Sequence, residues 1–374
     1  MPRAASIYRL GIKELWSLAR DPMMLVLIAY TFTVSIYVAA TAMPETLHKA
    51  PIAIVDEDGS PLSLRIATAF YPPRFNPPAM ISLAGIDAGM DAGDYTFVLD
   101  IPPAFQSDVL AGRSPVIQLN VDATRMSQAF TGSAYVQQMV LGEVTEFVQR
   151  YRGTAPLAVE LALRARFNPN LEQSWFGAVM EIINNVTLLS IILTGAALIR
   201  EREHGTIEHL LAMPVTPAEI MLSKVWSMGL VVLLAAAMAL ALIVQGLLRI
   251  PVEGAVTLFL AGAALHLFAT TSLGIFMATL ARSMPQFGML AVLILLPLQL
   301  LSGNSTPRES MPALVQTLML GAPTTHFVVL SQAILYRGAG IMVVWPAFLA
   351  LAGIGAVFFG IALNRFRRTI SQMA

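Results

Sequence analysis

The sequence predicts an α-helical integral membrane protein with six transmembrane helices and a small α/β extracytoplasmic domain inserted between helices 1 and 2. Three observations lead to this prediction. The 374 residues are 56% hydrophobic and only 12% charged, about half the charged fraction of a soluble domain. Six apolar runs are long enough to cross a bilayer. A more polar stretch of about 135 residues separates the first two runs.

The composition excludes several classes of function. The 23 Lys and Arg residues together balance the 23 Asp and Glu residues, so the chain has no net charge that would attract nucleic acid. The chain has no cysteine, and its five histidines form no pair at metal-ligand spacing. None of its lysines lies in a GxxxxGK[ST] phosphate loop, so the chain cannot hydrolyse ATP alone. We therefore expect no enzyme, no metal and no directly bound cofactor.

Residues 1–22 are expected to form a cytoplasmic interfacial helix. One helical face carries the apolar or small side chains of Tyr8, Ile12, Leu15 and Ala19. Such a face favours contact with membrane lipid, although a solvated extension is the alternative. Asp21-Pro22 should end this helix, because proline disfavours α geometry in the residue before it. The segment lacks the pattern of a cleaved signal peptide.

The spanning helices follow from runs of roughly 20 apolar residues. Transmembrane helix 1 is expected at 23–42. Segment 178–364 contains the other five helices, with apolar runs at about 176–199, 225–248, 255–281, 286–302 and 338–364.

The uncharged stretch 311–336 complicates this count. Pro312 and Pro323 divide it into two pieces that are too short to span. We therefore expect two short helices within an outer re-entrant region, 303–337, while the sequence also leaves a full span open.

Positive charges indicate the orientation, because Lys and Arg are enriched in short cytoplasmic flanks. With the N-terminus inside, the inner segments contain 11 such residues: Arg3, Arg9, Lys13, Arg20, Arg200, Arg202, Lys224, Arg282, Arg365, Arg367 and Arg368. The short outer loops contain only Arg249, Arg308 and Arg337. Both termini, including the tail 365–374, are expected in the cytoplasm.

The polar stretch 43–177 is expected to be the α/β domain. Strand-like runs occupy 51–55, 95–99 and 116–121, and helical patterns occupy 62–70 and 127–151. The acidic residues 56–58 are too closely spaced for a calcium loop, so we interpret them as a turn between a strand and a helix. No catalytic constellation is present in this segment.

The segment 200–224 is the most informative inner loop. Four charged residues continue an apolar helix, Gly205 interrupts it, and Thr206 can cap a new helix with Glu208. Ile207, Leu210 and Leu211 then give a short apolar face, which Pro214 and Pro217 close. The pattern predicts a short helix across the mouth of two spans, suited to docking in a groove of a partner protein.

This loop resembles the coupling loop of ABC-2 type ABC exporter permeases, Glu-x-x-x-Gly-Thr-x-Glu-x-Leu, then Pro and Gly-Lys. The matching positions are Glu201, Gly205, Thr206, Glu208, Leu210, Pro214 and Lys224. Met213 and Ser223 depart from the usual Ser or Thr and Gly. The outer region resembles the drug-exporter-like subgroup of that family at Ser302, Gly303, Pro307, Met311, Pro312 and Pro323.

The resemblance implies the permease subunit of an exporter in a bacterial inner membrane. It implies a separate ABC ATPase that uses ATP, and a second permease chain, identical or related. Arg202 and Glu203 would join Glu201 and Glu208 in ion pairs with the ATPase, while Ile207 and Leu210 would be buried in it. A hydrophobic or amphipathic small molecule such as a drug would be the substrate. By analogy, a periplasmic adaptor protein is a further partner.

Polar residues inside the spans are candidates for the pathway or for gating. Glu181, Asn184 and Asn185 either sense substrate or protons, or simply lie at the interface facing the outer domain, which we favour. His266 and Gln299 either line a pathway or bind a neighbouring helix. Pro297 is expected to kink the fifth span, which suits gating but also ordinary tolerance.

A second class of function stays open. The chain could be a membrane-anchored module whose outer domain binds or assembles envelope proteins without transport. A neighbouring reading frame that encodes an ATPase would favour transport over this alternative.

Overall fold

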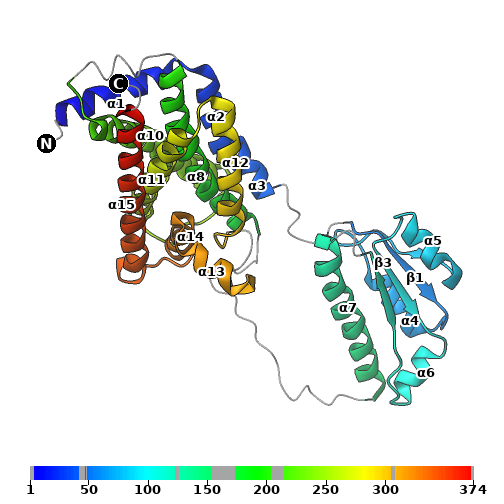
Figure 1. The fold of residues 1–374 in the computed structure, drawn as a ribbon. Coiled ribbons are helices and arrows are strands. Elements are labelled where there is room, and N and C mark those ends of the chain that lie inside the picture. The colour runs from blue at the N-terminus through cyan, green and yellow to red at the C-terminus, as the bar shows by residue number, and fades with distance from the viewer. Residues whose placement is uncertain are drawn as a thin grey trace. The chain divides into compact units, whose positions relative to one another are not determined.

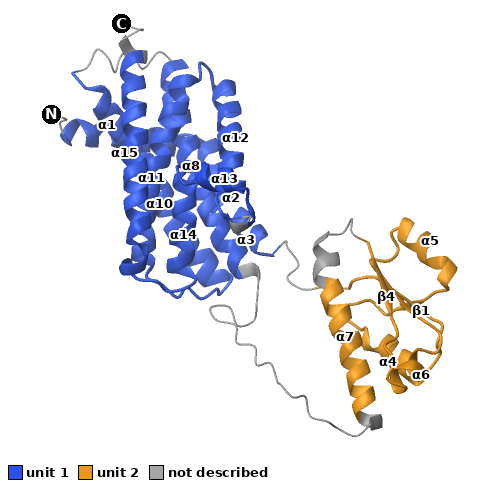
Figure 2. Ribbon diagram, turned by 60° about the horizontal axis from the view of Figure 1, so that its bottom comes forward, with its two compact units in different colours: residues 1–43, 165–374 blue, residues 44–164 orange. Residues whose placement is uncertain are grey.

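The computed structural model of the chain describes residues 4–41, 47, 49–122, 126–152, 173–203, 214–304 and 308–371. The chain divides into two compact units, which Figure 2 colours separately. Unit 1 comprises Met1–Met43 and Ala165–Ala374, and unit 2 comprises Pro44–Arg164. Unit 2 is thus inserted between the first helices and the rest of unit 1.

All the regular secondary structure described in unit 1 is helical. Its α-helices are α1 (Ala4–Ala19), α2 (Pro22–Phe32), α3 (Val34–Thr41), α8 (Gln173–Glu203), α10 (Pro217–Met238), α11 (Val256–Leu280), α12 (Met284–Leu300), α13 (Ala313–Met319), α14 (Pro323–Leu335) and α15 (Ile341–Ser371). A π-helical segment, Ala239–Leu247, continues α10, and a 3-10 turn, Arg308–Ser310, precedes α13.

Five helices among the described residues are long and apolar enough to cross a membrane. They cover Pro22–Thr41, Trp175–Glu203, Pro217–Leu247, Val256–Leu280 and Ile341–Arg368. The pair α13 and α14 would add a sixth if it is one broken span, but the two helices meet at a bend of 87°. α12, which lies where the sequence predicts the fifth span, is an apolar helix of only 17 residues. The protein is therefore a multi-pass membrane protein with five to six candidate spans.

The first span is two helices rather than one. α2 begins with Pro22 after Asp21, whose carboxylate accepts a hydrogen bond from the Met24 backbone N–H. The helix ends at Phe32, and Thr33 leaves α geometry before α3 begins. Asp21-Pro22 thus separates α1 from α2 as the sequence predicts, while the break at Thr33 carried no proline or glycine signal.

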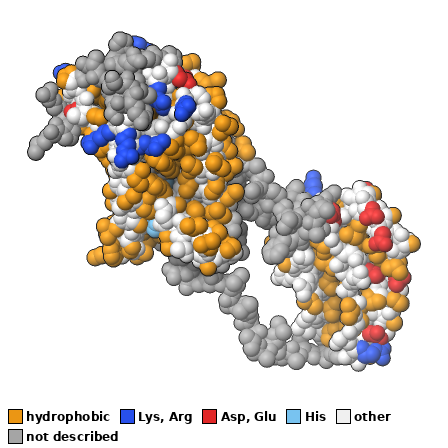
Figure 3. Space-filling view, viewed as in Figure 1, with side chains coloured by type: hydrophobic (Ala, Val, Ile, Leu, Met, Phe, Trp, Pro, Cys, Tyr) orange, Lys and Arg blue, Asp and Glu red, His pale blue; other side chains and the backbone are white. Residues whose placement is uncertain are grey.

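The N- and C-termini lie at the same end of unit 1 (Figure 1). This end, called the terminal end below, also carries the last residues of α8 and α11 and the first residues of α10 and α12. Lys and Arg side chains gather there, whereas hydrophobic side chains cover the flank of the bundle in this view (Figure 3). A bundle with this distribution fits a bilayer around its flank.

Unit 2 contains a four-stranded sheet in the order β2-β1-β3-β4. Its elements are β1 (Ile52–Asp56), α4 (Pro61–Ala69), β2 (Ala79–Met80), η1 (Leu83–Gly85), α5 (Ile86–Asp91), β3 (Phe97–Ile101), α6 (Phe105–Leu110), β4 (Gln118–Val121) and α7 (Met126–Arg152). β1 runs parallel to β2 and β3, and β4 runs antiparallel to β3.

Side chains on the two faces of this sheet form separate hydrophobic clusters. Ile54 and Leu99 face the larger cluster, together with residues of α4, α6 and α7. Val55 and Val98 face a smaller cluster with Ile86 of α5. The turn after β1 is held by Asp56, whose carboxylate accepts hydrogen bonds from the backbone N–H groups of Asp58 and Gly59. The carboxylate thus serves the strand-to-helix turn.

Candidate functional site

The site is the stem of the inner loop, which comprises residues 200–203 at the end of α8 and residues 216–224 at the start of α10. Each of the last four residues of α8, Arg200 to Glu203, binds a different part of the terminal end. Arg200 Nη1 donates to Asp21 Oδ2, before α2, at 2.6 Å. Glu201 binds α1 and α10, as described below. These four consecutive charged residues connect α8 to the surrounding helices.

Arg202 and Glu203 satisfy the ends of two further helices. Arg202 Nη1 donates to the backbone oxygens of Ala278 and Ala281 at 3.0 and 2.9 Å, at the C-terminal end of α11. The Glu203 carboxylate accepts from the backbone N–H of Met284, the first residue of α12, at 2.9 Å. Helix C-termini favour cations and N-termini favour anions, so each charge matches the helix end that it binds.

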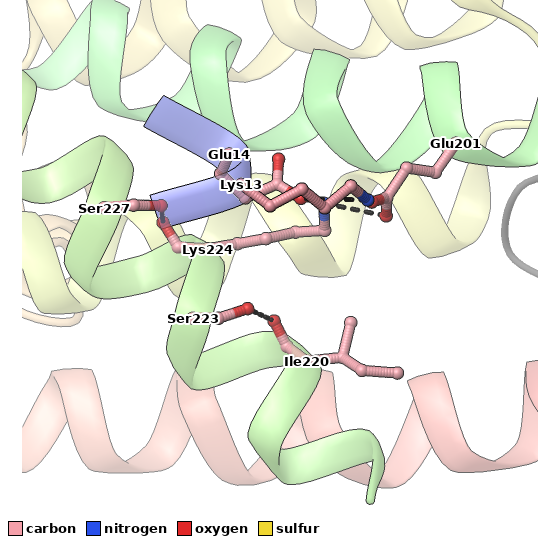
Figure 4. Close-up of polar contacts among 7 residues, drawn as sticks. All are labelled: Lys13, Glu14, Glu201, Ile220, Ser223, Lys224 and Ser227. Carbon is pink, nitrogen blue, oxygen red and sulfur yellow. Dashed lines mark hydrogen bonds and ion pairs between the residues drawn. The ribbon is translucent and has the colours of Figure 1, made fainter. Parts of the chain in front are cut away.

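A buried charge cluster joins α1, α8 and α10 (Figure 4). The Lys224 ammonium lies 3.0 Å from Glu14 Oε1 and 2.7 Å from Glu201 Oε2. Lys13 Nζ donates to Glu201 Oε1 at 2.8 Å. Lys224 is only 1% exposed, Glu14 6% and Glu201 8%. Two ammonium groups and two carboxylates balance one another, which is the condition under which buried charges are tolerated.

Burial perturbs the two members of the cluster on α1. Burial raises the pKa of the Glu14 carboxyl, although the nearby Lys224 ammonium acts in the opposite direction. For Lys13, burial lowers the pKa, but the carboxylates of Glu201 and Glu14 outweigh it and raise the pKa above its ordinary value. Lys13 therefore stays protonated at physiological pH.

The packing of α1 on α10 depends on a small residue. Trp226 of α10 donates through Nε1 to the Ile7 carbonyl at 3.2 Å, and its ring stacks on Tyr8 at 6.0 Å between centroids. A Cβ atom added at Gly11 would lie 2.1 Å from this indole, so only glycine fits there. The residues that α1 buries are Gly11, Glu14 and Leu18. Tyr8 and Ala19 of the predicted apolar face remain exposed.

A cavity of about 240 Å³ adjoins the cluster, with Lys13, Glu14, Arg200 and Glu201 among its lining residues. It opens between α1 and the last turns of α8. The charged groups therefore line a cavity at the junction of these helices.

The structure makes the inner loop shorter than the predicted 200–224. α8 continues to Glu203, and α10 begins at Pro217. Thr216 and Glu219 form a capping box: Glu219 N donates to Thr216 Oγ1 at 3.3 Å, and Thr216 N donates to Glu219 Oε2 at 2.6 Å. Lys224 therefore lies inside a helix. Its neighbour Ser223, at the position where the family commonly has Gly, donates to the Ile220 carbonyl at 2.8 Å.

Several predicted residues of the loop lie outside the described residues, namely Gly205, Thr206, Ile207, Glu208 and Leu210. Their contact with an ATPase stays a prediction. Pro214 is described and exposed. Sequence reasoning missed Glu14 and Lys13 as members of the site and Glu219 as a cap. The Thr-x-x-Glu spacing was a usable signal for the cap, whereas nothing local marked the partners on α1.

The polar residues near the other end of α8 connect this helix to neighbouring segments. Ser35 Oγ donates to Glu181 Oε1 at 2.5 Å, and Asn185 Nδ2 donates to the Thr31 carbonyl at 2.8 Å. These two contacts flank the break at Thr33. Asn304 Nδ2 donates to Asn184 Oδ1 at 2.7 Å. All three predicted residues thus bind other segments of unit 1.

His266 lies in the buried interior of unit 1. It is fully buried, its Nε2 lies 2.8 Å from Thr187 Oγ1, and its ring stacks on Phe327 of α14 at 4.2 Å between centroids. The histidine therefore joins α8, α11 and α14. Gln299 is half-buried and Pro297 is exposed, both on α12.

The outer motif surrounds α13 and α14. Ser302 is buried, and Gly303 adopts a left-handed φ of 94°, which explains glycine there. Met311 is buried, Pro312 precedes α13, and Pro323 is the first residue of α14. Pro307 lies outside the described residues. The two prolines thus divide this segment into two helices, as the sequence predicts.

Comparison with known proteins places these features in a family. The sequence profile described as "ABC-2 family transporter protein" matches residues 22–364. The chain is 62% identical over 374 residues to the inner membrane transport permease YhhJ of Escherichia coli (strain K12), which covers 100% of both chains.

Two more distant relatives share the same general description. The chain is 26% identical over 361 residues to the probable multidrug ABC transporter permease YbhR of Escherichia coli (strain K12), covering 96% of this chain and 97% of the relative. It is also 26% identical over 295 residues to the probable multidrug ABC transporter permease YbhS of the same organism, covering 76% and 75%. Because the family profile covers most of the chain and one relative matches it end to end, this chain belongs to the ABC-2 family of transporter proteins and is a multi-pass inner-membrane transport permease.

Proposed function

We propose that this permease is the transmembrane subunit of an ATP-driven exporter, in which the loop stem passes the motion of an ABC ATPase to the membrane helices. One observation carries the proposal: Arg200, Glu201, Arg202 and Glu203 each bind a different part of the terminal end. Membership of the family implies an ABC ATPase partner and a pair of permease chains.

The stem is built to move as one body. The two ends of the loop are bridged where Lys224 binds Glu201, so a force on the loop reaches α8 and α10 together. Glu14 and Lys13 extend this body to α1, and Arg202 and Glu203 extend it to α11 and α12. A displacement of a few ångströms at the loop would therefore tilt several helices at once, as rigid-body switching requires.

The terminal end would face the cytoplasm and the ATPase. The excess of Lys and Arg in its short flanks supports this orientation. Unit 2 would then be periplasmic, where an adaptor protein is a candidate partner. α1 would lie at the membrane interface, with exposed Tyr8 and Trp16 toward lipid.

The proposed substrate is a hydrophobic or amphipathic small molecule such as a drug. Two relatives of 26% identity are described as probable multidrug permeases, which supports this class without defining a compound. The pathway would form between two permease chains, either identical or related.

The test is co-purification followed by ATPase and transport assays in proteoliposomes. The tagged chain should recover an ABC ATPase. Arg202→Gln and Glu203→Gln should assemble normally but lose most of the substrate-stimulated ATPase activity, because α11 and α12 are released from the stem. Arg282→Gln is the matched control, since Arg282 is an exposed cation at the same end.

The opposite results would exclude the proposal. Full stimulation in both stem variants would remove the stem from the coupling mechanism. Recovery of envelope proteins without an ATPase would instead support a membrane-anchored assembly module.

A further inference from the structure

Unit 2 contains a cleft of about 880 Å³ between α6 and α7. Its size lies within the range of roughly 300–1,000 Å³ that is typical of small-molecule sites. Leu99 of β3 and Leu119 of β4, which are register partners in the sheet, belong to its lining. Phe105 of α6 and Val140 of α7 line it from the two helices.

The two lips of the cleft expose large apolar side chains. Val116, in the loop before β4, is 80% exposed, and Leu141 of α7 is 57% exposed, although both line the cleft. Exposed apolar side chains that meet across a concave surface commonly mark a binding site. The core of the unit is complete beneath them, because Leu99, Phe105 and Val140 are already buried.

The charge at the cleft selects the polar part of a ligand. Among the described residues that line it, Arg113 is the only charged one, and none carries a carboxylate. Asp108 accepts from Arg113 Nε at 2.9 Å and from Nη2. A guanidinium has five N–H donors, so Nη1 can bind a second acceptor beside the apolar walls.

We propose that this cleft binds a single-chain amphiphile with an anionic head group, of the fatty-acid class. The tail lies along Val116, Leu119 and Leu141, and the carboxylate accepts hydrogen bonds from Arg113. The site is separate from the loop stem, and the proposal holds whether or not the chain exports drugs.

Cysteine protection in the full-length protein tests this site, because the chain has no native cysteine. Leu141→Cys is the reporter, and Leu83→Cys is the control, since Leu83 is 51% exposed in unit 2 outside the cleft. Each variant is placed in phosphatidylcholine nanodiscs and labelled with a maleimide, with or without sodium dodecanoate. Dodecanoate should slow labelling of Leu141→Cys at least threefold and leave Leu83→Cys unchanged.

Two comparisons separate the site from general adsorption. Dodecyltrimethylammonium has the same tail with a cationic head and should not protect Leu141→Cys. Arg113→Gln should raise the half-protective dodecanoate concentration about tenfold, the effect of losing one charge-assisted hydrogen bond. Ala134→Trp, which adds bulk at the exposed lip, should abolish protection while Leu83→Cys still labels at its normal rate.

Several results would overturn the proposal. Equal protection of both cysteines, or equal protection by the cationic amphiphile, would indicate adsorption to the disc or the protein surface. A Leu141→Cys that is unreactive before any addition would mean that another part of the protein or a second copy already covers the cleft.

Discussion

Replacing Lys224 with methionine tests whether the charge cluster holds the terminal end together. The lysine is 1% exposed and lies 3.0 Å from Glu14 and 2.7 Å from Glu201. Methionine fills much of the same volume but removes the ammonium between the two buried carboxylates, and Lys13 remains as a cation bound to both. Lys13 lies 2.8 Å from Glu201 and 3.8 Å from Glu14, and its side chain is 47% exposed.

The expected loss follows from the uncompensated charge. Removing one partner of a buried ion pair costs about 3–5 kcal/mol. At roughly 2–4 °C per kcal/mol, this corresponds to a decrease in Tm on the order of 10 °C. The double variant Lys224→Met with Glu14→Gln should recover more than half of the loss, because Glu201 then retains Lys13 in a balanced pair.

Thermal unfolding of purified protein in mild detergent, followed by size-exclusion chromatography, measures these differences. Lys49→Met, which removes a lysine of unit 2, is the control for loss of charge alone. A Lys224→Met variant within 2 °C of the wild type would refute the reasoning, as would a double variant no more stable than the single one.

Three further predictions concern unit 1. Burial raises the pKa of Glu14, so the stability contributed by its protonated form is lost as the pH rises from the ordinary glutamate range through the raised pKa. The Tm of the wild type relative to Glu14→Gln should therefore fall over that pH window. A difference that grows with pH would contradict this assignment. Gly274→Val places a Cβ atom 2.7 Å from the Ile191 carbonyl oxygen and should destabilise the α8–α11 contact by about 1–3 kcal/mol in thermal unfolding. Gly288→Val should be neutral, because the added Cβ atom would have no neighbour within 4 Å. Equal Tm values for the two variants would disprove the packing argument. In whole cells, a maleimide should label Arg368→Cys only after permeabilisation and Gly340→Cys, at the other end of α15, from outside; the reverse pattern would invert the proposed orientation.

Hydropathy predicted the long helices well because the bilayer fixes their minimum length. The apolar runs overlap α8, α10 with the π-helical segment that continues it, α11 and α15, and Pro323 marks the start of α14. The strands β1, β3 and β4 also lie where β-branched runs predict them. Hydropathy failed at helix ends. It places the third span at 225–248, whereas α10 begins at Pro217, after the capping box of Thr216 and Glu219, and the charged Lys224 inside the helix is paired with Glu14.

The site was only half predictable for a related reason. Glu201 and Lys224 were found through a local motif, but their partner Glu14 is 210 residues from Lys224 in the chain. A charged residue on an amphipathic helix ordinarily faces solvent, so Glu14 gave no sign of burial. The face of α1 that packs against α10 is instead defined by Gly11, whose missing Cβ matters only beside Trp226. Such contacts are properties of tertiary packing.

The bridge between Glu201 and Lys224 has a consequence for how partner specificity can change. Among the described residues, the contacts that join these helices lie at the two ends of the loop, in residues 200–203 and from Thr216 onward. Exchanging residues 204–215 for those of a related permease would leave each of these contacts in place. A chimera made at these two junctions should keep the stability of its own membrane domain while acquiring the ATPase preference of the donor. The choice of ATPase partner could therefore change in evolution through substitutions in the roughly one dozen residues of this loop.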